Sequence, residues 1–537
     1  MQTKKKFGLA LSALLAVSML GGMTACSSTP IDAEYPTDPG FDSRALINWS
    51  TLKPEFWNLD CAHDPVIVEE DGTFYVFGTD NYGPFGYQIR KSTDLINWEY
   101  VGVAIPEFGD SNTVLAKGEA GESPLQEVYD YLAESSKFDC ATLWAPEVYP
   151  AADGGYWLYG SWTTTFGSYR SIIFQCHADS VTGPYEYVDM IVFSNNELMD
   201  AGLGGINAID AAVVEDPDGG LWLSYGSFST GFAMIELDPE TGLRKDGYTY
   251  DMIVNGEITA DQYVGEHYMD IRNTEGSTLS YHADVPVYTG DIASEEYDES
   301  KWTTQSSYYL MGSNGSLSEN YNMRVWKSES VDSGYTSLNG INGNKVSGSF
   351  SWREKAGQAS IRYDYFCPGH NDMITTSAGV NLIVYHNRVT MNDASKHYLF
   401  LSMYDFNSNG DLVLSPNRYA GESVRTVDPA EITGLTKGEY DMVQLKTTTL
   451  NNSGQATPVW CTEGVKFKKN GSISGAVSGS WKMYGDHYIY LEIDGAKYYG
   501  SVMPAWIEKN GGNGGLTISA LSEKGTAIYF NMAFEKE

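Results

Sequence analysis

Five stretches of the chain share one pattern, a turn followed by a run of aromatic and β-branched residues. They are DGTFYVFGT (71–79), DGGYWLYGS (153–161), DGGLWLSYGS (218–227), SSYYLMGS (306–313) and SAGVNLIVYHN (377–387). Such a run after a turn is typical of antiparallel sheet. A further strand pattern follows each one, as MRVWKSESVDSGYTS (323–337) follows the fourth. Five repeats without sustained helical periodicity predict an all-β, five-bladed β-propeller, and their regular recurrence disfavours a many-stranded sandwich.

A short segment with a polar or charged residue near its start precedes each repeated stretch. The five segments are AHDPVIVEEDG, WAPEVYPAADG, AIDAAVVEDPDG, TEGSTLSY and GHNDMITTSAG. In a propeller the innermost strand of each blade lines the central channel, so the starts of these strands should converge at one mouth. The pattern therefore predicts a ring of functional groups, with Asp64, Asp210 and Glu275 at three of the openings.

Three carboxyl groups at one mouth suit the cleavage of a glycosidic bond. One carboxylic acid protonates the leaving oxygen, and a carboxylate on the opposite face activates water or attacks directly. A third acid nearby raises the pKa of the proton donor by like-charge repulsion. A single aspartate in an acidic protein is usually a turn or surface residue. The matched positions of Asp64, Asp210 and Glu275 within the repeat are what favour a catalytic interpretation.

The composition limits the partners of the protein. The 537 residues carry a net charge of −36, which becomes −39 when the three lysines of residues 1–25 are removed. So acidic a surface repels phosphates and argues against nucleic acid, whereas a neutral substrate is compatible with it. The five cysteines after Cys26 have no spacing typical of zinc, and we assign no disulfide. We expect a monomer.

The N-terminus has the pattern of an export signal. Residues 1–6 are basic, residues 7–20 are apolar, and small residues precede Cys26. This segment is too short and wrongly flanked for a stable membrane span. It resembles a bacterial lipoprotein processing site, so we expect residues 1–25 to be removed and Cys26 to be acylated, giving an exported, membrane-anchored protein. Ordinary cleavage with free secretion is the alternative. Residues 26–45 are polar and contain proline, as a tether would.

Several motifs resemble one enzyme family when they are taken together in chain order. They are AHDPVIVEEDGTFYVFGT, LWAPEVYP, NAIDAAVVEDPDGGLWLSYGSF, YNMRVWKS and YHNR, within residues 55 to 420. The chain resembles the family 43 glycoside hydrolases, particularly the larger two-domain endo-arabinanases. The resemblance implies a catalytic propeller over residues 46–434 that inverts the anomeric centre. In that family pattern Asp64 is the general base, Asp210 tunes the pKa of the acid and orients the substrate, and Glu275 is the general acid.

The position of the general acid depends on an unusual spacing. TEGSTLSY fits the family pattern and indicates Glu275, but HADVPVYTGDIASEEYDESKWTTQS separates it from the strand that follows. We interpret this segment as a loop inserted at the cleft, and closure of the cleft would decide between internal and exo cleavage. Glu266, in GEHYMD, is the alternative acid. For an inverting enzyme the carboxyl groups of Asp64 and Glu275 should lie roughly 6.5–9.5 Å apart.

The resemblance also implies ligands beyond the three acids. His370, in PGHNDM, corresponds to a family histidine that helps to hold calcium near the propeller axis, largely through water. From the residues alone, a single histidine is more often a hydrogen-bonded core residue, and calcium prefers oxygen ligands. The implied substrate-binding residues are Asp64, Trp144, Gly167, Asn207, Ala208, Ile209, Asp210, Gly226, Ser227 and Phe228. Core packing is the competing interpretation for Trp144 and Phe228.

Residues 435–537 form a separate pattern. SGSWKMYGDHYIYLEIDGAKYYGSVMPAWI and GTAIYFNMAFE alternate apolar and polar residues between glycine turns, which predicts a small β-barrel or sandwich domain. The favoured function is internal hydrolysis of α-1,5-linked L-arabinan from plant cell walls. The alternatives are an exo-acting α-L-arabinofuranosidase or β-xylosidase of the same family, and a non-catalytic surface lipoprotein that binds glycans.

Overall fold

The structure is a computed structural model, and it describes the greater part of the chain after residue 32. The described residues are 33–41, 62–79, 86–105, 125–133, 143–163, 170–194, 205–265, 267–357, 360, 362–388, 397–445, 449–450 and 456–535. Three residues singled out from the sequence, Cys26, Gly167 and Glu266, lie outside them. The chain divides into two units, residues 1–34 and 35–537, and the second contains all the elements described below.

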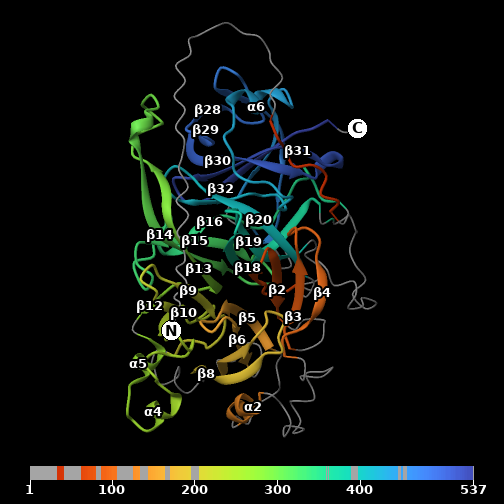
Figure 1. The fold of residues 1–537 in the computed structure, drawn as a ribbon. Helices are drawn as coiled ribbons and strands as arrows, with labels where there is room; N and C mark the ends of the chain where they lie inside the picture. Colours follow the sequence, from red (N-terminus) through yellow and green to blue (C-terminus); the bar gives the residue numbers. More distant parts are fainter. Residues whose placement is uncertain are drawn as a thin grey trace, which may run out of the picture. The chain divides into compact units, whose positions relative to one another are not determined.

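Five antiparallel sheets form the blades of a β-propeller (Figure 1). Blade 1 holds β1 (Val66–Glu70), β2 (Thr73–Gly78), β3 (Gln88–Ser92) and β4 (Glu99–Val103). Blade 2 holds β5 (Leu143–Pro150), β6 (Tyr156–Thr163), β7 (Ser171–Ala178) and β8 (Glu186–Ser194). Blade 3 holds β9 (Ala212–Glu215), β10 (Leu221–Tyr225), β11 (Phe232–Leu237) and β12 (His267–Met269).

The last two blades are longer and more irregular. Blade 4 holds β13 (Thr274–Tyr288), β14 (Trp302–Asn314), β15 (Asn322–Ser328) and β16 (Asn344–Lys345). Blade 5 holds β18 (Asp364–Thr375), β19 (Asn381–Arg388), β20 (Tyr398–Phe406) and β21 (Leu412–Leu414), extended by β17 (Phe350–Ser351) and β25 (Val459–Trp460). The short helices are α2 (Gln126–Ala133), α4 (Tyr250–Val254), α5 (Ala260–Val264) and α6 (Pro429–Gly434). None of the helices in the described part of the chain has the length and apolar character needed to cross a bilayer.

The first strands of the five blades surround one axis. Going around it, β1 contacts β5, β5 contacts β9, β9 contacts β13, β13 contacts β18, and β18 returns to β1. The repeated turn-and-strand stretches of the sequence are the second strands, β2, β6, β10, β14 and β19. The segments that precede them contribute the inner strands, as the sequence predicts. The prediction of an all-β, five-bladed propeller is confirmed.

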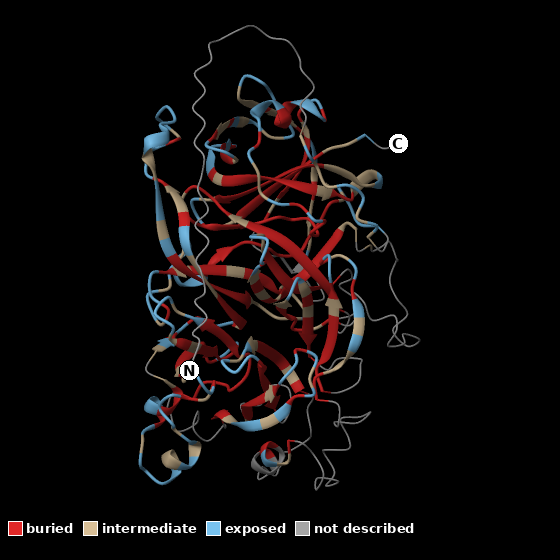
Figure 2. Ribbon diagram, in the orientation of Figure 1, coloured by how far each residue is buried: buried red, intermediate tan, exposed pale blue. Residues whose placement is uncertain are grey.

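The hydrophobic core lies mainly between neighbouring blades, in the buried strands of Figure 2. Strand β2 illustrates how the sequence produces it. Its alternate residues point to opposite faces of the sheet, so Val76 packs with Leu382 and Val384 of blade 5, whereas Phe77 packs with Leu158 of blade 2. Burying both faces of each sheet in this way holds the ring of blades together through the hydrophobic effect.

The C-terminal part is a closed barrel of eight strands, which confirms the predicted small β domain. The barrel strands are β22 (Glu439–Gln444), β26 (Thr462–Phe467), β27 (Ser472–Gly475), β28 (Gly479–Tyr484), β29 (Tyr488–Ile493), β30 (Ala496–Ile507), β31 (Asn513–Ser522) and β32 (Ala527–Met532). Strands β23 (Thr449–Leu450) and β24 (Ala456–Thr457) form a small separate sheet. Parallel pairing of β17 with β25 links blade 5 to the chain entering the barrel.

Part of the predicted tether contacts this C-terminal region. The Tyr35 hydroxyl donates a hydrogen bond to Glu431 Oε2 at 2.7 Å. The guanidinium of Arg418 lies 3.9 Å from the centre of the Phe41 ring, a distance at which a cation–π interaction is favourable. Tyr35 and Phe41 are therefore packed against the folded protein.

The interpretation of the blade 4 insertion as a loop at the cleft is wrong. The inserted residues continue β13 and β14 into a long hairpin, whose strands pair as far as Tyr288 and Trp302. The Trp302 ring lies 4.6 Å from the Tyr488 ring of the barrel, and Lys482 Nζ donates to the Glu295 carbonyl at 2.8 Å. Because an extended strand rises about 3.3 Å per residue, the tip lies far from Glu275 at the start of β13. The hairpin contacts the barrel and does not close the mouth.

Candidate active site

The five inner strands share a backbone feature at the mouth of the propeller. One residue in each opening has a positive φ angle: Asp64 (48°), Ala145 (40°), Asp210 (60°), Gly276 (59°) and His370 (44°). This left-handed conformation is uncommon for residues other than glycine and costs about 1–3 kcal/mol when it is strained. A kink recurring at one place in every blade marks a position where side chains or backbone groups are redirected. Three of the five residues are a predicted acid or the predicted calcium ligand.

Asp64 is a buried carboxylate held mainly by histidines. His370 Nδ1 lies 3.0 Å from Oδ1, and His63 Nδ1 lies 2.9 Å from Oδ2. The Thr79 hydroxyl donates to Oδ2 at 2.6 Å and accepts from the backbone N–H of Ala145 at 2.8 Å. Burial by itself would raise the pKa of Asp64, but the charges of His370 and His63 outweigh it and hold that pKa well below its ordinary value. Asp64 is therefore ionised, as a general base must be.

Asp210 connects the third blade to the strand that carries the predicted acid. Its backbone N–H donates to the Ser161 hydroxyl at 3.2 Å, and its Oδ2 accepts from the backbone N–H of Gly276 at 3.1 Å. Burial raises the pKa of Asp210, and the negative charge of Asp64 raises it further, against the opposing effect of His370. Through Gly276, Asp210 holds the backbone directly beside Glu275.

Glu275 has the opposite electrostatic environment to Asp64. Burial raises its pKa to about 8, with a second contribution from the negative charge of Asp210. The Ser227 hydroxyl lies 3.5 Å from Oε2, at the long limit of a hydrogen bond. A carboxyl group with this pKa is protonated at neutral pH and can donate its proton to a leaving oxygen. The structure thus brings the three predicted acids into one electrostatically coupled group.

The residues around Asp210 and Glu275 form a loop framework at the mouth. Asn207 Oδ1 accepts from the Ser171 hydroxyl at 3.0 Å, and Ala208 is completely buried. The Gly226 backbone N–H donates to the Ile209 carbonyl at 3.0 Å. At Gly226 φ is 121°, and a Cβ would lie 2.2 Å from a backbone oxygen, so a side chain does not fit there.

Phe228 is the most accessible of the predicted substrate-binding residues with large apolar side chains. It is 37% exposed, and its carbonyl accepts from the Asn273 N–H at 2.6 Å, just before the strand that carries Glu275. Trp144 is partly exposed on β5, and its carbonyl accepts from the Tyr87 hydroxyl at 3.2 Å. Partial exposure keeps both aromatic residues compatible with contact to a sugar ring.

The structure adds residues that the sequence argument did not select. His63 and Thr79 contact Asp64 directly, and His386 Nδ1 accepts from the Asp64 backbone N–H at 3.2 Å. The buried Tyr321 ring lies 5.9 Å from the His386 ring, and burial together with the charge of Glu275 raises the pKa of its hydroxyl well above the ordinary value. His63, Tyr321 and His386 belong to AHDP, YNMRVWKS and YHNR, so the motifs pointed to the segments without indicating these side chains.

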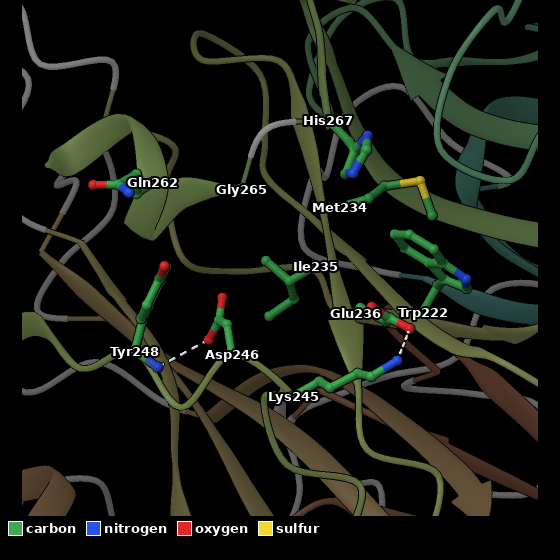
Figure 3. A pocket seen from close by; sticks show the side chains of 10 residues that line it. All are labelled: Trp222, Met234, Ile235, Glu236, Lys245, Asp246, Tyr248, Gln262, Gly265 and His267. Atoms are coloured by element: carbon green, nitrogen blue, oxygen red, sulfur yellow. Dashed lines mark hydrogen bonds and ion pairs between the residues drawn. The ribbon is translucent and has the colours of Figure 1, made fainter. Parts of the chain in front are cut away.

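A separate cavity of about 320 Å³ lies on blade 3, among β10, β11 and α5 (Figure 3). Lys245 and Glu236 form an ion pair beside it, and the Tyr248 N–H donates to Asp246 at 2.9 Å. The cavity contains none of the three predicted acids, and its charged side chains are already paired. The arrangement suited to acid–base chemistry is at the mouth of the propeller.

The donor chemistry near His370 is compatible with a water-rich calcium site. His370 Nδ1 is directed to Asp64, so Nε2 is the nitrogen that remains for an ion. Calcium usually takes six to eight ligands and prefers oxygen. A single imidazole nitrogen therefore fits calcium only when water supplies most of the coordination, which is the arrangement that the resemblance implies.

Comparison with known proteins identifies the family. The description "glycosyl hydrolases family 43" matches residues 60–410, and "C-terminal lipocalin-like domain" matches residues 416–530. The chain is 26% identical over 511 residues to extracellular endo-α-(1→5)-L-arabinanase 2 of Bacillus subtilis, covering 89% of this chain and 94% of that protein. It is 28% identical over 464 residues to the extracellular endo-α-(1→5)-L-arabinanase of Thermotoga petrophila, covering 80% and 84%.

A solved structure gives the same result. The crystal structure of endo-1,5-α-L-arabinanase from Thermotoga petrophila matches with a TM-score of 0.67 at 25% identity, covering 89% of this chain and 99% of that chain. The chain belongs to glycosyl hydrolases family 43 and is a glycosidase.

Proposed function

We propose that this protein hydrolyses α-1,5-linked L-arabinan internally, with inversion at the anomeric carbon. The observation that carries the proposal is the pairing of an ionised Asp64 with a protonated Glu275 at one mouth. Relatives named endo-arabinanases that align over most of the chain support the substrate.

The proposed mechanism divides the chemistry among three carboxyl groups. Glu275 donates its proton to the departing glycosidic oxygen as the bond to the anomeric carbon breaks. Asp64 removes a proton from a water molecule, which attacks from the opposite face and inverts the configuration. Asp210 keeps Glu275 protonated through its negative charge and positions it through the hydrogen bond from Gly276. Proton magnetic resonance of the first-formed product tests the stereochemistry, and retention would contradict this mechanism.

Substrate binding in this proposal relies on a few aromatic surfaces and on backbone groups around Asp210. Phe228 and Trp144 would provide apolar contacts for neutral furanose rings. The remaining proposed contacts are Gly167, Asn207, Ala208, Ile209, Gly226 and Ser227. Ala208 is fully buried and Gly226 has no side chain, so these two would contribute backbone groups.

We also propose that His370 Nε2 holds a calcium ion whose other ligands are mainly water. When bound, the ion would supply positive charge that favours ionised Asp64 and orders nearby water. Chelation is expected to lower activity and added calcium to restore it, and His370→Ala should remove this calcium dependence. Unchanged activity after exhaustive chelation would contradict the proposal.

The proposed location is the outer face of the cell envelope, with an acyl group on Cys26. The basic and apolar residues before Cys26 support export and lipid attachment, and relatives described as extracellular support export. Labelled palmitate should be incorporated into the wild type and not into Cys26→Ala. Labelling of neither protein, with the enzyme free in the medium, would support ordinary secretion.

Product analysis on linear arabinan tests the function directly. The wild type should release a ladder of arabino-oligosaccharides, Glu275→Gln should release almost none, and Glu266→Gln should behave like the wild type. Arabinose as the sole product would indicate an exo-acting enzyme. Binding without any product from the wild type would support a glycan-binding protein.

A further inference from the structure

Two histidines of blade 5 and one from the opening of blade 1 meet beside the active site. His63 precedes Asp64 at the opening of blade 1, His386 lies on β19, and His397 immediately precedes β20. The ring centres are 4.3 Å apart for His386 and His397, 4.4 Å for His63 and His397, and 4.8 Å for His63 and His386. Each residue offers one ring nitrogen such that the three nitrogens lie within 4.8 Å of one another.

The nitrogens of this group are buried without protein partners that would explain their position. His386 is 0% and His397 2% exposed. Within the described residues, both ring nitrogens of His397 lack a hydrogen-bond partner. The Nε2 atoms of His63 and His386 lack one as well. An unpaired buried polar group destabilises the folded protein, so a ligand or water that pairs with several of these nitrogens is strongly favoured.

The Nδ1 atoms of His63 and His386 lie near the Asp64 carboxylate, although neither forms a hydrogen bond with it. His63 Nδ1 lies 2.9 Å from Asp64 Oδ2, and His386 Nδ1 lies 3.6 Å from Asp64 Oδ1. Metal-binding histidines commonly direct their second nitrogen to a carboxylate, which leaves Nε2 for the metal, and the Asp64 carboxylate is near enough to take that role. The hydrogen bond from the Asp64 backbone N–H to His386 Nδ1 favours the opposite tautomer. Binding of an ion at Nε2 of His386 would move the ring proton to Nδ1. The hydrogen bond from the Asp64 N–H would then be replaced by an interaction of Nδ1–H with the Asp64 carboxylate.

We propose that His63, His386 and His397 form a binding site for a divalent transition metal of the zinc, cobalt or nickel class. Imidazole nitrogen suits these metals, whereas calcium prefers oxygen, so the site is distinct from the calcium site at His370. Zinc–nitrogen bonds of about 2.0–2.1 Å in tetrahedral geometry require the three nitrogens to approach to about 3.3 Å. The rings therefore draw together around the ion. The ion joins blade 5 to the residue preceding Asp64.

Metal binding by the chain, purified without a histidine tag, tests this proposal. After chelation and dialysis, titration with cobalt should give one bound equivalent with the absorption bands of a nitrogen-ligated ion. Zinc should displace the cobalt and raise the thermal unfolding midpoint. His397→Phe should weaken cobalt binding by about 100-fold or more, because a lost ligand costs at least as much as a lost outer-shell partner. His267→Ala, a partly exposed histidine paired with Asp332, is the matched control and should bind cobalt like the wild type.

Two results would overturn the proposal. One is a wild type that binds no cobalt or zinc at micromolar concentration, which would indicate that water alone pairs with the three rings. The other is retention of the cobalt bands by a folded His397→Phe variant. If that variant does not fold, His397→Gln provides the same comparison, and the stoichiometry of the wild type remains a sufficient test. His370→Ala should leave the cobalt bands unchanged, which separates this site from the calcium site.

Discussion

The two sides of the propeller mouth each hold a buried carboxyl group, and the two groups are in opposite protonation states. On the blade 1 side, the charges of His370 and His63 keep the carboxyl group of Asp64 ionised despite its burial. On the blade 4 side, burial and the charge of Asp210 raise the pKa of Glu275 to about 8. Desolvation acts in the same direction on both groups, so the neighbouring charges decide which carboxyl group is the base and which is the acid.

Asp64→Asn should produce the largest effect. The variant has no base to activate water, so kcat/KM on linear arabinan should fall by about 10⁴-fold, the upper end of the range for general base catalysis. The loss should be similar for substrates with good and poor leaving groups, because the base does not act on the leaving oxygen. Steady-state kinetics on arabinan and on an aryl arabino-oligosaccharide measures both values, and substantial remaining arabinan activity would contradict the role of Asp64.

Glu275→Gln should lose somewhat less activity and show a different dependence on the leaving group. On arabinan the loss should be about 10³-fold, because an alkoxide leaves poorly without protonation. On an aryl arabino-oligosaccharide the loss should be much smaller, since a phenolate needs little assistance. Equal losses on the two substrates would show that Glu275 is not the proton donor.

Asp210→Asn should shift the pH profile as well as the rate. The general acid works while it is protonated, so activity falls as the pH rises through the pKa of Glu275. Removing the negative charge of Asp210 lowers that pKa, and the basic limb of the kcat/KM profile should move to lower pH. We expect a loss of about 10- to 100-fold at neutral pH, at or below the lower end of the range for general acid–base catalysis, because Glu275 itself remains. A basic limb that stays in place would show that Asp210 does not tune Glu275.

Trp302→Ala should leave the roles of Asp64 and Glu275 unchanged, because the blade 4 hairpin lies outside the active site. Trp302 is partly exposed and packs on Tyr484 and Tyr488 of the barrel. Its removal should lower the free energy of unfolding by about 1–2 kcal/mol, less than a fully buried tryptophan would cost. The length distribution of products from arabinan should not change. A shift toward arabinose or toward longer products would mean that the hairpin contacts substrate.

The sequence was sufficient to predict the propeller because one turn-and-strand pattern recurs five times. The positions of Asp64, Asp210 and Glu275 followed from the same repeat, since residues at one offset converge at the axis. The histidine cluster could not be predicted, because only ring closure brings His386 and His397 to His63. The hairpin is not evident from the sequence because bulges and exposed residues interrupt the alternation along β13. Such a segment has no clear strand period.

The pH dependence of kcat/KM on linear arabinan tests the central claim most directly. The free enzyme needs ionised Asp64 and protonated Glu275. Activity should therefore be lost only when the pH falls below about 4 on the acidic side, and when it rises through about 8 on the basic side. The basic limb should disappear in Glu275→Gln, whose remaining activity has no acid to titrate. The assignment of acid and base would be contradicted if the basic limb of the wild-type kcat/KM profile lay well below pH 7. It would also be contradicted if the basic limb persisted in Glu275→Gln.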